Sequence, residues 1–251
     1  MHEKKRVKLG VRTDDDRDYI DATYASFNRE DYIIVQSPSK ANVGDFWRMV
    51  WQDGVMLIVC VVEADNFSET DVTKCYPYWP VKQHSTMKIL VIIMHFLDWT
   101  PSKWPNIDRL GAFVHSMSTK ETTIIRRITD DYVPPVVIQG HQGINRSCAV
   151  WVGTVLMKQI ERKECFDVEY LVRYLTRLRI GAFQDRINFF LTFAIAYRIA
   201  SLGGWISLAE AKGRIKEIRA AALGSSVKES PNSKSKQDSG RKKRAKSLVS
   251  S

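Results

Sequence analysis

The residues most able to do chemistry lie in segment 136–150, which reads VVIQGHQGINRSCAV. A β-branched run predicts a buried strand, two glycines mark a loop, and an apolar helix pattern follows. Such a loop points successive backbone N–H groups inward, and the helix N-terminus adds partial positive charge. Arg146 stands at the start of that helix, where its guanidinium can hold a phosphate through two hydrogen bonds. The segment predicts an anion site, although an ordinary strand-to-helix turn with Arg146 as a surface charge fits equally well.

The elements around this loop alternate between strand and helix patterns. Strands are predicted where β-branched and apolar residues run together, and helices where apolar residues recur every three or four positions. Ser207 and Glu210 form a capping box for the last helix. This alternation predicts an α/β domain in which helices cover a central sheet. The expected strands are 32–35, 55–62, 89–95 and 136–138, and the expected helices lie near 46–51, 107–117, 147–160, 168–178, 187–200 and 208–222.

Five segments carry a resemblance to a known family. They are 18–24 (DYIDATY), 32–38 (YIIVQSP), 45–51 (DFWRMVW), 74–80 (KCYPYWP) and 143–147 (GINRS). Each is similar to a motif of the cysteine-dependent protein tyrosine phosphatases, and the five occur in that family's order. The resemblance spans most of residues 4–200. It implies a central mixed, highly twisted sheet flanked by helices, with the rings of Phe46, Trp47, Trp51 and Trp79 packed in the core.

The resemblance also implies a set of ligand-binding residues. Gln184 matches a glutamine that orients water in the family, and Asn188 replaces a second one. Both are accessory candidates, and helix capping or loop hydrogen bonding is their alternative role. The phosphate-binding loop itself would consist of Gly143, Ile144, Asn145, Arg146 and Ser147.

The nucleophile of the family is missing from the matching position. The family's cysteine precedes the loop arginine by six residues, and this chain has Gly140 there, with Gln139 in place of the preceding histidine. Glycine has no side chain that could attack phosphorus, and a loop cysteine works only as a thiolate. Cys148 lies inside the following helix and is expected to be a buried core thiol. The covalent route of the family is therefore not expected here.

The general acid is also missing. The family carries W-P-D on a mobile loop, and the matching stretch is 95–101, reading HFLDWTP. Aligned on Trp99, the acid position holds Pro101, whereas Asp98 lies on the other side of the tryptophan. Loss of a general acid alone typically slows a reaction by about 10²- to 10⁴-fold.

Two segments of the family pattern are expected to be absent or shortened. The chain begins at the segment that 5–9 resembles, so the substrate-stacking loop and first helices of the family have no counterpart. Between Pro80 and Met87 the chain is shorter than the family pattern, which predicts a missing or shortened hairpin.

Composition limits the other possibilities. The net charge is +10, and residues 225–251 hold eight basic and two acidic residues with few apolar ones. We expect a phosphatase-like domain at 1–222 and a disordered basic tail at 223–251. The longest apolar run, 55–62, is too short to span a membrane, and no secretory signal is evident. The four separated cysteines predict reduced thiols in an intracellular protein, without a zinc site, a disulfide framework or a cofactor.

Three functions remain as hypotheses. The first is a catalytically inactive family member that binds a phosphorylated protein or acts as a scaffold; scaffolding is favoured slightly, because His141 and Gln142 are bulky for a phosphate pocket. The second is an active phosphatase acting on phosphotyrosine, which would need another nucleophile. The third is a nuclear interaction protein, since 240–246 (GRKKRAK) resembles an import signal or a polyanion-binding patch. The expected location is the cytoplasm, with entry into the nucleus through that cluster.

Overall fold

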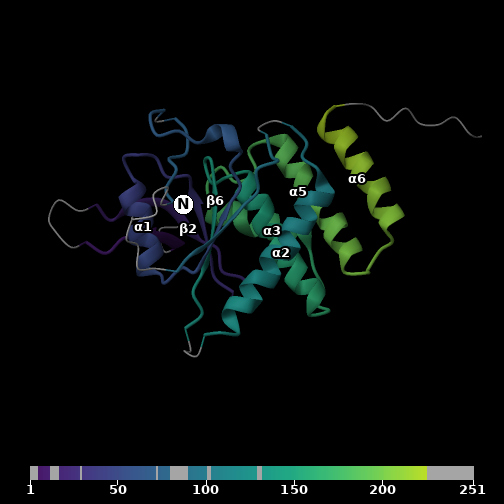
Figure 1. Ribbon diagram of the computed structural model, residues 1–251. Helices are drawn as coiled ribbons and strands as arrows, with labels where there is room; N and C mark the ends of the chain where they lie inside the picture. The colour runs from purple at the N-terminus through teal and green to yellow at the C-terminus, as the bar shows by residue number, and fades with distance from the viewer. Residues whose placement is uncertain are drawn as a thin grey trace, which may run out of the picture.

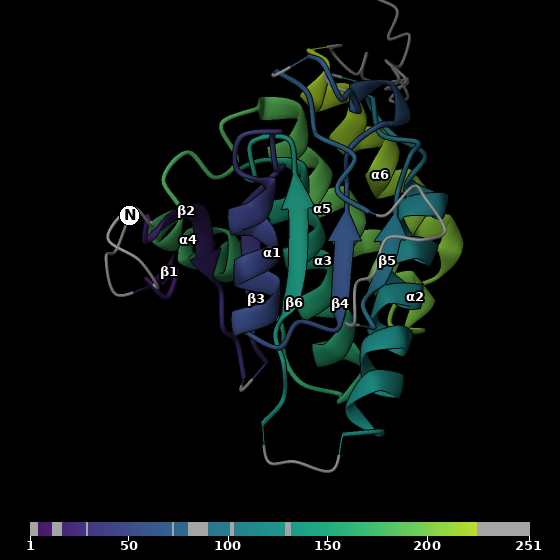
Figure 2. The same ribbon diagram turned by 60° about the vertical axis from the view of Figure 1, so that its left-hand side comes forward.

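The computed structural model describes residues 5–11, 17–28, 30–71, 73–79, 90–100, 103–128 and 132–224. The strands in this part of the chain are β1 (Arg6–Lys8), β2 (Tyr19–Tyr24), β3 (Tyr32–Gln36), β4 (Leu57–Cys60), β5 (Ile92–His95) and β6 (Val136–Gly140). They form one sheet in the order β1-β2-β3-β6-β4-β5 (Figure 2). The pairs from β1 to β3 are antiparallel, whereas those from β3 to β5 are parallel. The sheet is therefore mixed, as predicted.

Helices cover both faces of this sheet. They are α1 (Val43–Gln52), α2 (Ile107–Ile125), α3 (Arg146–Glu161), α4 (Val168–Leu178), α5 (Arg186–Leu202) and α6 (Leu208–Ala222), with a 3₁₀ turn at Ala64–Asn66. In Figure 2, α1 lies in front of the sheet and α3 and α5 lie behind it. Two apolar clusters result, one beneath α1 and a larger one around α3. α6 packs on α5 at the outside of the molecule (Figure 1). The predicted α/β fold is confirmed.

The sequence places the helix starts well, because polar caps mark them. Ser207 accepts a hydrogen bond from the Glu210 N–H at 3.1 Å, so α6 begins at the predicted cap. Asp167 and Asp185 cap α4 and α5 in the same way. The strand expected over 55–62 is shorter, since only Leu57–Cys60 forms β4.

One core prediction is wrong. Trp51 is 60 % exposed, although its neighbour Phe46 is buried. α1 buries Phe46, Met49 and Val50. Successive helical residues lie about 100° apart, so the residue after Val50 turns away from the sheet. Trp47 is only partly buried, and its ring contacts Phe46 with centroids 5.9 Å apart. Trp79 is likewise partly buried against the cluster beneath α1.

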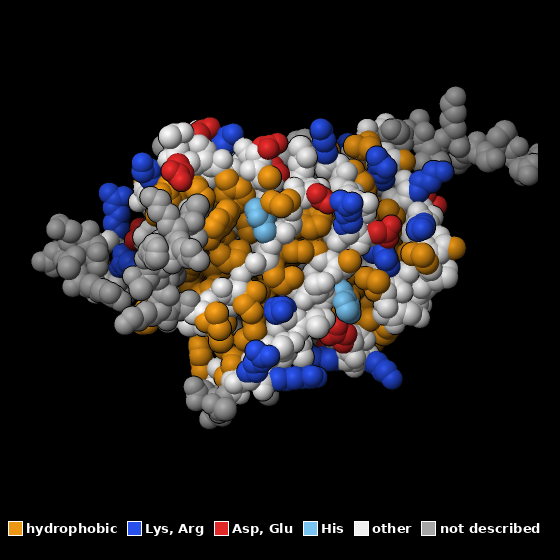
Figure 3. Space-filling view, viewed as in Figure 1, with side chains coloured by type: hydrophobic (Ala, Val, Ile, Leu, Met, Phe, Trp, Pro, Cys, Tyr) orange, Lys and Arg blue, Asp and Glu red, His pale blue; other side chains and the backbone are white. Residues whose placement is uncertain are grey.

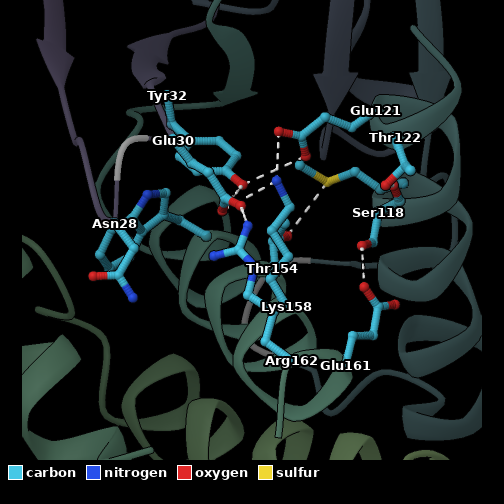
Figure 4. A network of polar contacts seen from close by, with 12 residues as sticks. Asn28, Glu30, Tyr32, Ser118, Glu121, Thr122, Thr154, Lys158, Glu161 and Arg162 are labelled. Carbon is cyan, nitrogen blue, oxygen red and sulfur yellow. Dashed lines mark hydrogen bonds and ion pairs between the residues drawn. The ribbon is translucent and has the colours of Figure 1, made fainter. Parts of the chain in front are cut away.

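A buried polar network ties α3 to the start of β3 and to α2 (Figure 4). The Lys158 ammonium lies 2.5 Å from Glu121 and 3.1 Å from Glu30. The Tyr32 hydroxyl donates to either carboxylate at 3.4 Å. Each charged side chain of this network therefore has a partner. The network holds the C-terminal part of α3, the helix that follows the loop, against α2 and the start of β3.

Several sequence-based expectations fall outside the described residues. They concern Pro101, the shortened stretch after Trp79, and the tail from residue 225 onward, including the basic cluster 240–246. In the part of the chain that the structure does describe, no helix combines the length and apolar character needed to cross a membrane.

Candidate functional site

The loop between Gly140 and Arg146 emerges from the middle of the sheet. It follows β6, which lies between β3 and β4, and leads directly into α3. The three strands are parallel, so the loop lies at their carboxyl ends, where α/β proteins commonly bind ligands. Figure 2 shows this end at the top, above the arrowhead of β6.

The carbonyl groups of the loop are bound to the body of the protein. Gly140 O accepts from the Ser37 N–H at 2.9 Å, and Ile144 O accepts from the Phe183 N–H at 2.8 Å. The carbonyls of Gln142 and Gly143 both accept from Arg179. In a trans peptide the N–H points opposite to the preceding carbonyl. The N–H groups that follow these carbonyls therefore point away from the supporting residues, apart from that of Gly143, which bonds Gly140 O. Two of them belong to His141 and Asn145, which line the cleft.

Gly143 is the one loop position where only glycine fits. Its φ is +65°, and a Cβ atom there would lie 2.7 Å from the Val35 carbonyl and 2.7 Å from the Arg179 guanidinium. A side chain would push the loop off its support. The positive φ and the close approach of Val35 and Arg179 thus explain why a glycine stands at position 143.

Arg179 is the loop's main support, and sequence reasoning missed it. Its side chain is 1 % exposed. Besides the two loop carbonyls, it contacts the Thr23 hydroxyl at 3.1 Å and the Asp21 carboxylate at 3.1 Å. No local pattern marks this arginine, because its partners lie on β2 and in a loop about 36 residues before it.

A cleft of about 390 Å³ opens beside the loop. The predicted residues Gly143, Asn145, Arg146, Ser147 and Asn188 come together there, whereas Ile144 and Gln184 do not line it. Ile144 instead anchors the loop through its carbonyl. The cleft is lined by Asn66, Thr73, Lys74, Trp99, Gly140, His141, Gln142, Gly143, Asn145, Arg146, Ser147, Asp185 and Asn188. His141 and Gln142 line it without closing it.

Only one nitrogen of the Arg146 guanidinium has partners among the described residues. Its Nη1 forms an ion pair with Glu63 and donates to the Trp99 carbonyl at 2.7 Å. A guanidinium carries five N–H donors. Within the described residues, Nε and Nη2 find no partner. The arginine therefore braces the loop and still presents donors to the cleft.

Three buried polar atoms around the cleft lack hydrogen-bond partners in the described structure. They are Ser147 Oγ, His141 Nδ1 and Asn188 Oδ1. A Cβ atom built on Gly140 would lie 3.2 Å from Ser147 Oγ. The serine hydroxyl thus faces the position where a larger residue would place its side chain. Buried polar groups are rarely left unpaired, so these atoms favour a bound polar ligand or water in the cleft.

None of the four cysteines, all of which lie in the described residues, lines the cleft. Burial raises the pKa of Cys60, Cys75 and Cys148 to about 12 in each case. These thiols are protonated at neutral pH and are therefore not nucleophiles. The expectation that Cys148 is a buried core thiol is confirmed. Cys165 is exposed, at the approach to α4, and does not line the cleft.

The carboxylates near the cleft are already engaged. Asp185 caps α5 by accepting from the N–H groups of Ile187 and Asn188. Asp98 is half exposed, lies 2.5 Å from Arg109 and does not line the cleft. Glu63 is paired with Arg146. In the described residues, no cluster of three His, Cys, Asp or Glu side chains could hold a metal.

Comparisons with known proteins agree with the motifs. The family model described as protein-tyrosine phosphatase matches residues 1–93 and 83–198. Receptor-type tyrosine-protein phosphatase eta from Mus musculus is 40% identical over 194 residues, which cover 66% of this chain and 15% of that protein. Tyrosine-protein phosphatase non-receptor type 5 from Rattus norvegicus is 25% identical over 213 residues, covering 73% and 56%. Receptor-type tyrosine-protein phosphatase zeta from Homo sapiens is 26% identical over 222 residues, covering 73% and 9%. The matches thus span between 9% and 56% of the length of these relatives.

Proposed function

Because the chain belongs to the protein-tyrosine phosphatase family, we propose that it is a member that binds phosphorylated protein without hydrolysing it. The single observation that carries this proposal is the cleft itself. Gly143 and Arg146 of the loop both line it, while Gly140 occupies the position of the nucleophile.

Phosphate binding would use three kinds of donor. The N–H groups of His141 and Asn145 follow anchored carbonyls, and the Nε and Nη2 donors of Arg146 have no described partner. Lys74 also lines the cleft, and its ammonium donates to the Asp65 carbonyl at 2.9 Å. Hydrogen bonds that involve a charged group contribute about 1.5–3 kcal/mol each. The start of α3 adds its helix dipole. Without a thiolate in the loop, a bound phosphate meets no repulsion from that position.

In the part of the chain that the structure describes, hydrolysis lacks both of its reacting groups. A nucleophile would have to come from a thiol, yet the three buried thiols have pKa values of about 12. The carboxylates of Asp185 and Glu63 are occupied by a helix N-terminus and by Arg146. The sequence places Pro101 where the family has its acid. No specific observation favours the active phosphatase of the sequence analysis.

The partner we propose is a phosphorylated segment of another protein, which would act in the cytoplasm. The cleft is open to solvent along rims formed by loops, so an extended peptide can reach it. A polyanion surface has less support. On the face shown in Figure 3, basic side chains are dispersed among acidic and hydrophobic ones. The basic cluster 240–246 lies outside the described residues.

A binding titration tests this proposal. A phosphotyrosine peptide and its unphosphorylated form are titrated into wild type, Arg146→Ala and Arg109→Ala. Arg109 is an exposed arginine that does not line the cleft, so it controls for loss of one positive charge. We expect saturable binding of the phosphopeptide alone, lost in Arg146→Ala and kept in Arg109→Ala. Equal binding to both peptides would refute the proposal.

A scaffold without a ligand is the second candidate, and the Arg146–Glu63 ion pair favours it. An arginine whose charge is already satisfied can serve stability alone. In that case wild type would show no phosphopeptide binding at millimolar concentration, while Arg146→Ala would lower the melting temperature.

A further inference from the structure

The last helix, α6, carries its exposed charges on two separate sides. Successive helical residues lie about 100° apart, so residues three and four positions apart share one side. Lys212, Lys216 and Arg219 follow this spacing, and all three are exposed. The glutamates of the helix lie on another side, where Glu217 pairs with Arg214 at 3.1 Å. The three residues, here called the α6 basic row, therefore have no acidic neighbour on their own side of the helix.

The α6 basic row runs toward the end of the molecule that holds the cleft. Figure 2 shows the C-terminal end of α6, in yellow, at the top, where the arrowhead of β6 also lies. Arg186 donates from its Nη2 to the Ala221 carbonyl at 3.0 Å, and its chain neighbour Asp185 lines the cleft. Arg219 lies in the same last turn of α6 as Ala221. One arginine side chain therefore joins the last turn of α6 to the residue beside the cleft.

The dimensions of the row suit a short acidic segment. At 1.5 Å per helical residue, Lys212 and Arg219 lie about 10 Å apart along α6. An extended peptide advances about 3.3–3.6 Å per residue, so about four of its residues match the row. Exposed ion pairs are individually weak. Three such contacts can therefore assist a ligand that is already held elsewhere, but they do not make a surface for a long polyanion.

We propose that the α6 basic row is a second contact for the phosphorylated partner and binds an acidic run that lies a few residues from the phosphate. The inference rests on the proposed function, because the phosphate in the cleft is the first contact. The partner is therefore a protein segment with two features, a phosphorylated residue and a separate acidic run. The row acts on affinity and on the choice of partner.

The test uses the full chain and three phosphotyrosine peptides. One peptide carries four glutamates that begin about five residues before the phosphotyrosine, the second carries them the same distance after it, and the third has glutamines at both places. Lys212→Gln, Lys216→Gln and Arg219→Gln together remove the charge of the row. Residues 225–251 are kept in every protein, so their charge does not differ between the titrations.

The control variant removes the same charge from another exposed surface. Its three positions lie in and directly after the C-terminal part of α2, and none of them lines the cleft. The substitutions are Lys120→Gln, Arg126→Gln and Arg127→Gln. Because all six side chains of the two variants are exposed, both variants should keep the melting temperature of wild type.

We expect wild type to bind one of the two acidic phosphopeptides about tenfold more tightly than the glutamine phosphopeptide at low salt. This gain should shrink as salt rises, because exposed charges are screened. The variant without the row should bind all three phosphopeptides alike, whereas the α2 control should keep the gain.

Four results would overturn the inference. If wild type binds all three phosphopeptides equally, or if the variant without the row keeps the gain, the inference fails while the proposed function stands. If the α2 control loses the gain as fully as the variant without the row, net charge explains the effect, and the inference again fails alone. If no phosphopeptide binds wild type at millimolar concentration, both the inference and the proposed function are refuted.

Discussion

Arg179 should decide whether the phosphate loop keeps its shape. The change to test is Arg179→Met, which retains much of the side-chain volume and removes every donor. Two loop carbonyls, those of Gln142 and Gly143, would lose the arginine as donor. Leaving a buried polar group unsatisfied costs about 1–3 kcal/mol. Breaking the pair with Asp21, whose side chain is about one-third exposed, adds less than a fully buried pair would.

The expected loss is about 3–5 kcal/mol of unfolding free energy, a large part of a domain's usual 5–15 kcal/mol. Urea denaturation followed by tryptophan fluorescence measures it. Phosphopeptide affinity should fall as well, because the N–H groups lose their fixed direction. Arg177→Met is the matched control, since Arg177 is exposed two residues earlier, in the last turn of α4, and Arg179 directly follows that helix. If Arg179→Met unfolded within 1 kcal/mol of that control and bound phosphopeptide like wild type, the loop would not depend on this arginine.

Two further substitutions test the account. Gly140→Cys should restore little phosphatase activity, because the new Cβ would lie 3.2–3.3 Å from the Ser147 side chain and, among the described residues, no free acid lines the cleft; a readily assayed rate on a phosphotyrosine peptide would contradict this. Lys158→Met should destabilise the fold by about 3–5 kcal/mol, since the buried Glu121 loses its cation and Glu30 keeps only Arg162. Burial raises the pKa of Glu121, and Lys158 opposes that rise. Without Lys158 the folded-state pKa of Glu121 is raised further, and a raised folded-state pKa gives stability at low pH that is lost as pH rises. The loss of stability of Lys158→Met relative to wild type, measured by thermal melts, should therefore be smaller at pH 5 than at pH 8. An equal loss at both pH values would refute the charge explanation.

The sequence predicts the fold well because its signals are local. Periodicity places the helices, and the predicted cap at Ser207 makes the expected hydrogen bond. Exposure within a helix is less predictable. The burial of Phe46 and the exposure of Trp51 depend on which side of α1 meets the sheet, which the family resemblance alone does not give.

The residues of the site also differ in how well the sequence predicts them. Gly143 and Arg146 were found because they lie in one continuous segment after a strand. Their partners were not found, because Glu63 is 83 residues away from Arg146 and Arg179 is 36 from Gly143. Only the folded sheet brings these residues together, so no spacing in the chain predicts them.

The central claim is that the cleft binds a phosphoryl group and leaves it intact. Phosphorus NMR of a phosphotyrosine peptide with the wild-type chain measures both parts at once. The account predicts that the ester resonance shifts or broadens with increasing protein until it saturates, that Arg146→Ala abolishes this change, and that no inorganic phosphate signal grows above the protein-free control. An inorganic phosphate signal whose growth scales with wild-type protein and disappears in Arg146→Ala would contradict it, and so would an ester resonance that does not respond to the protein.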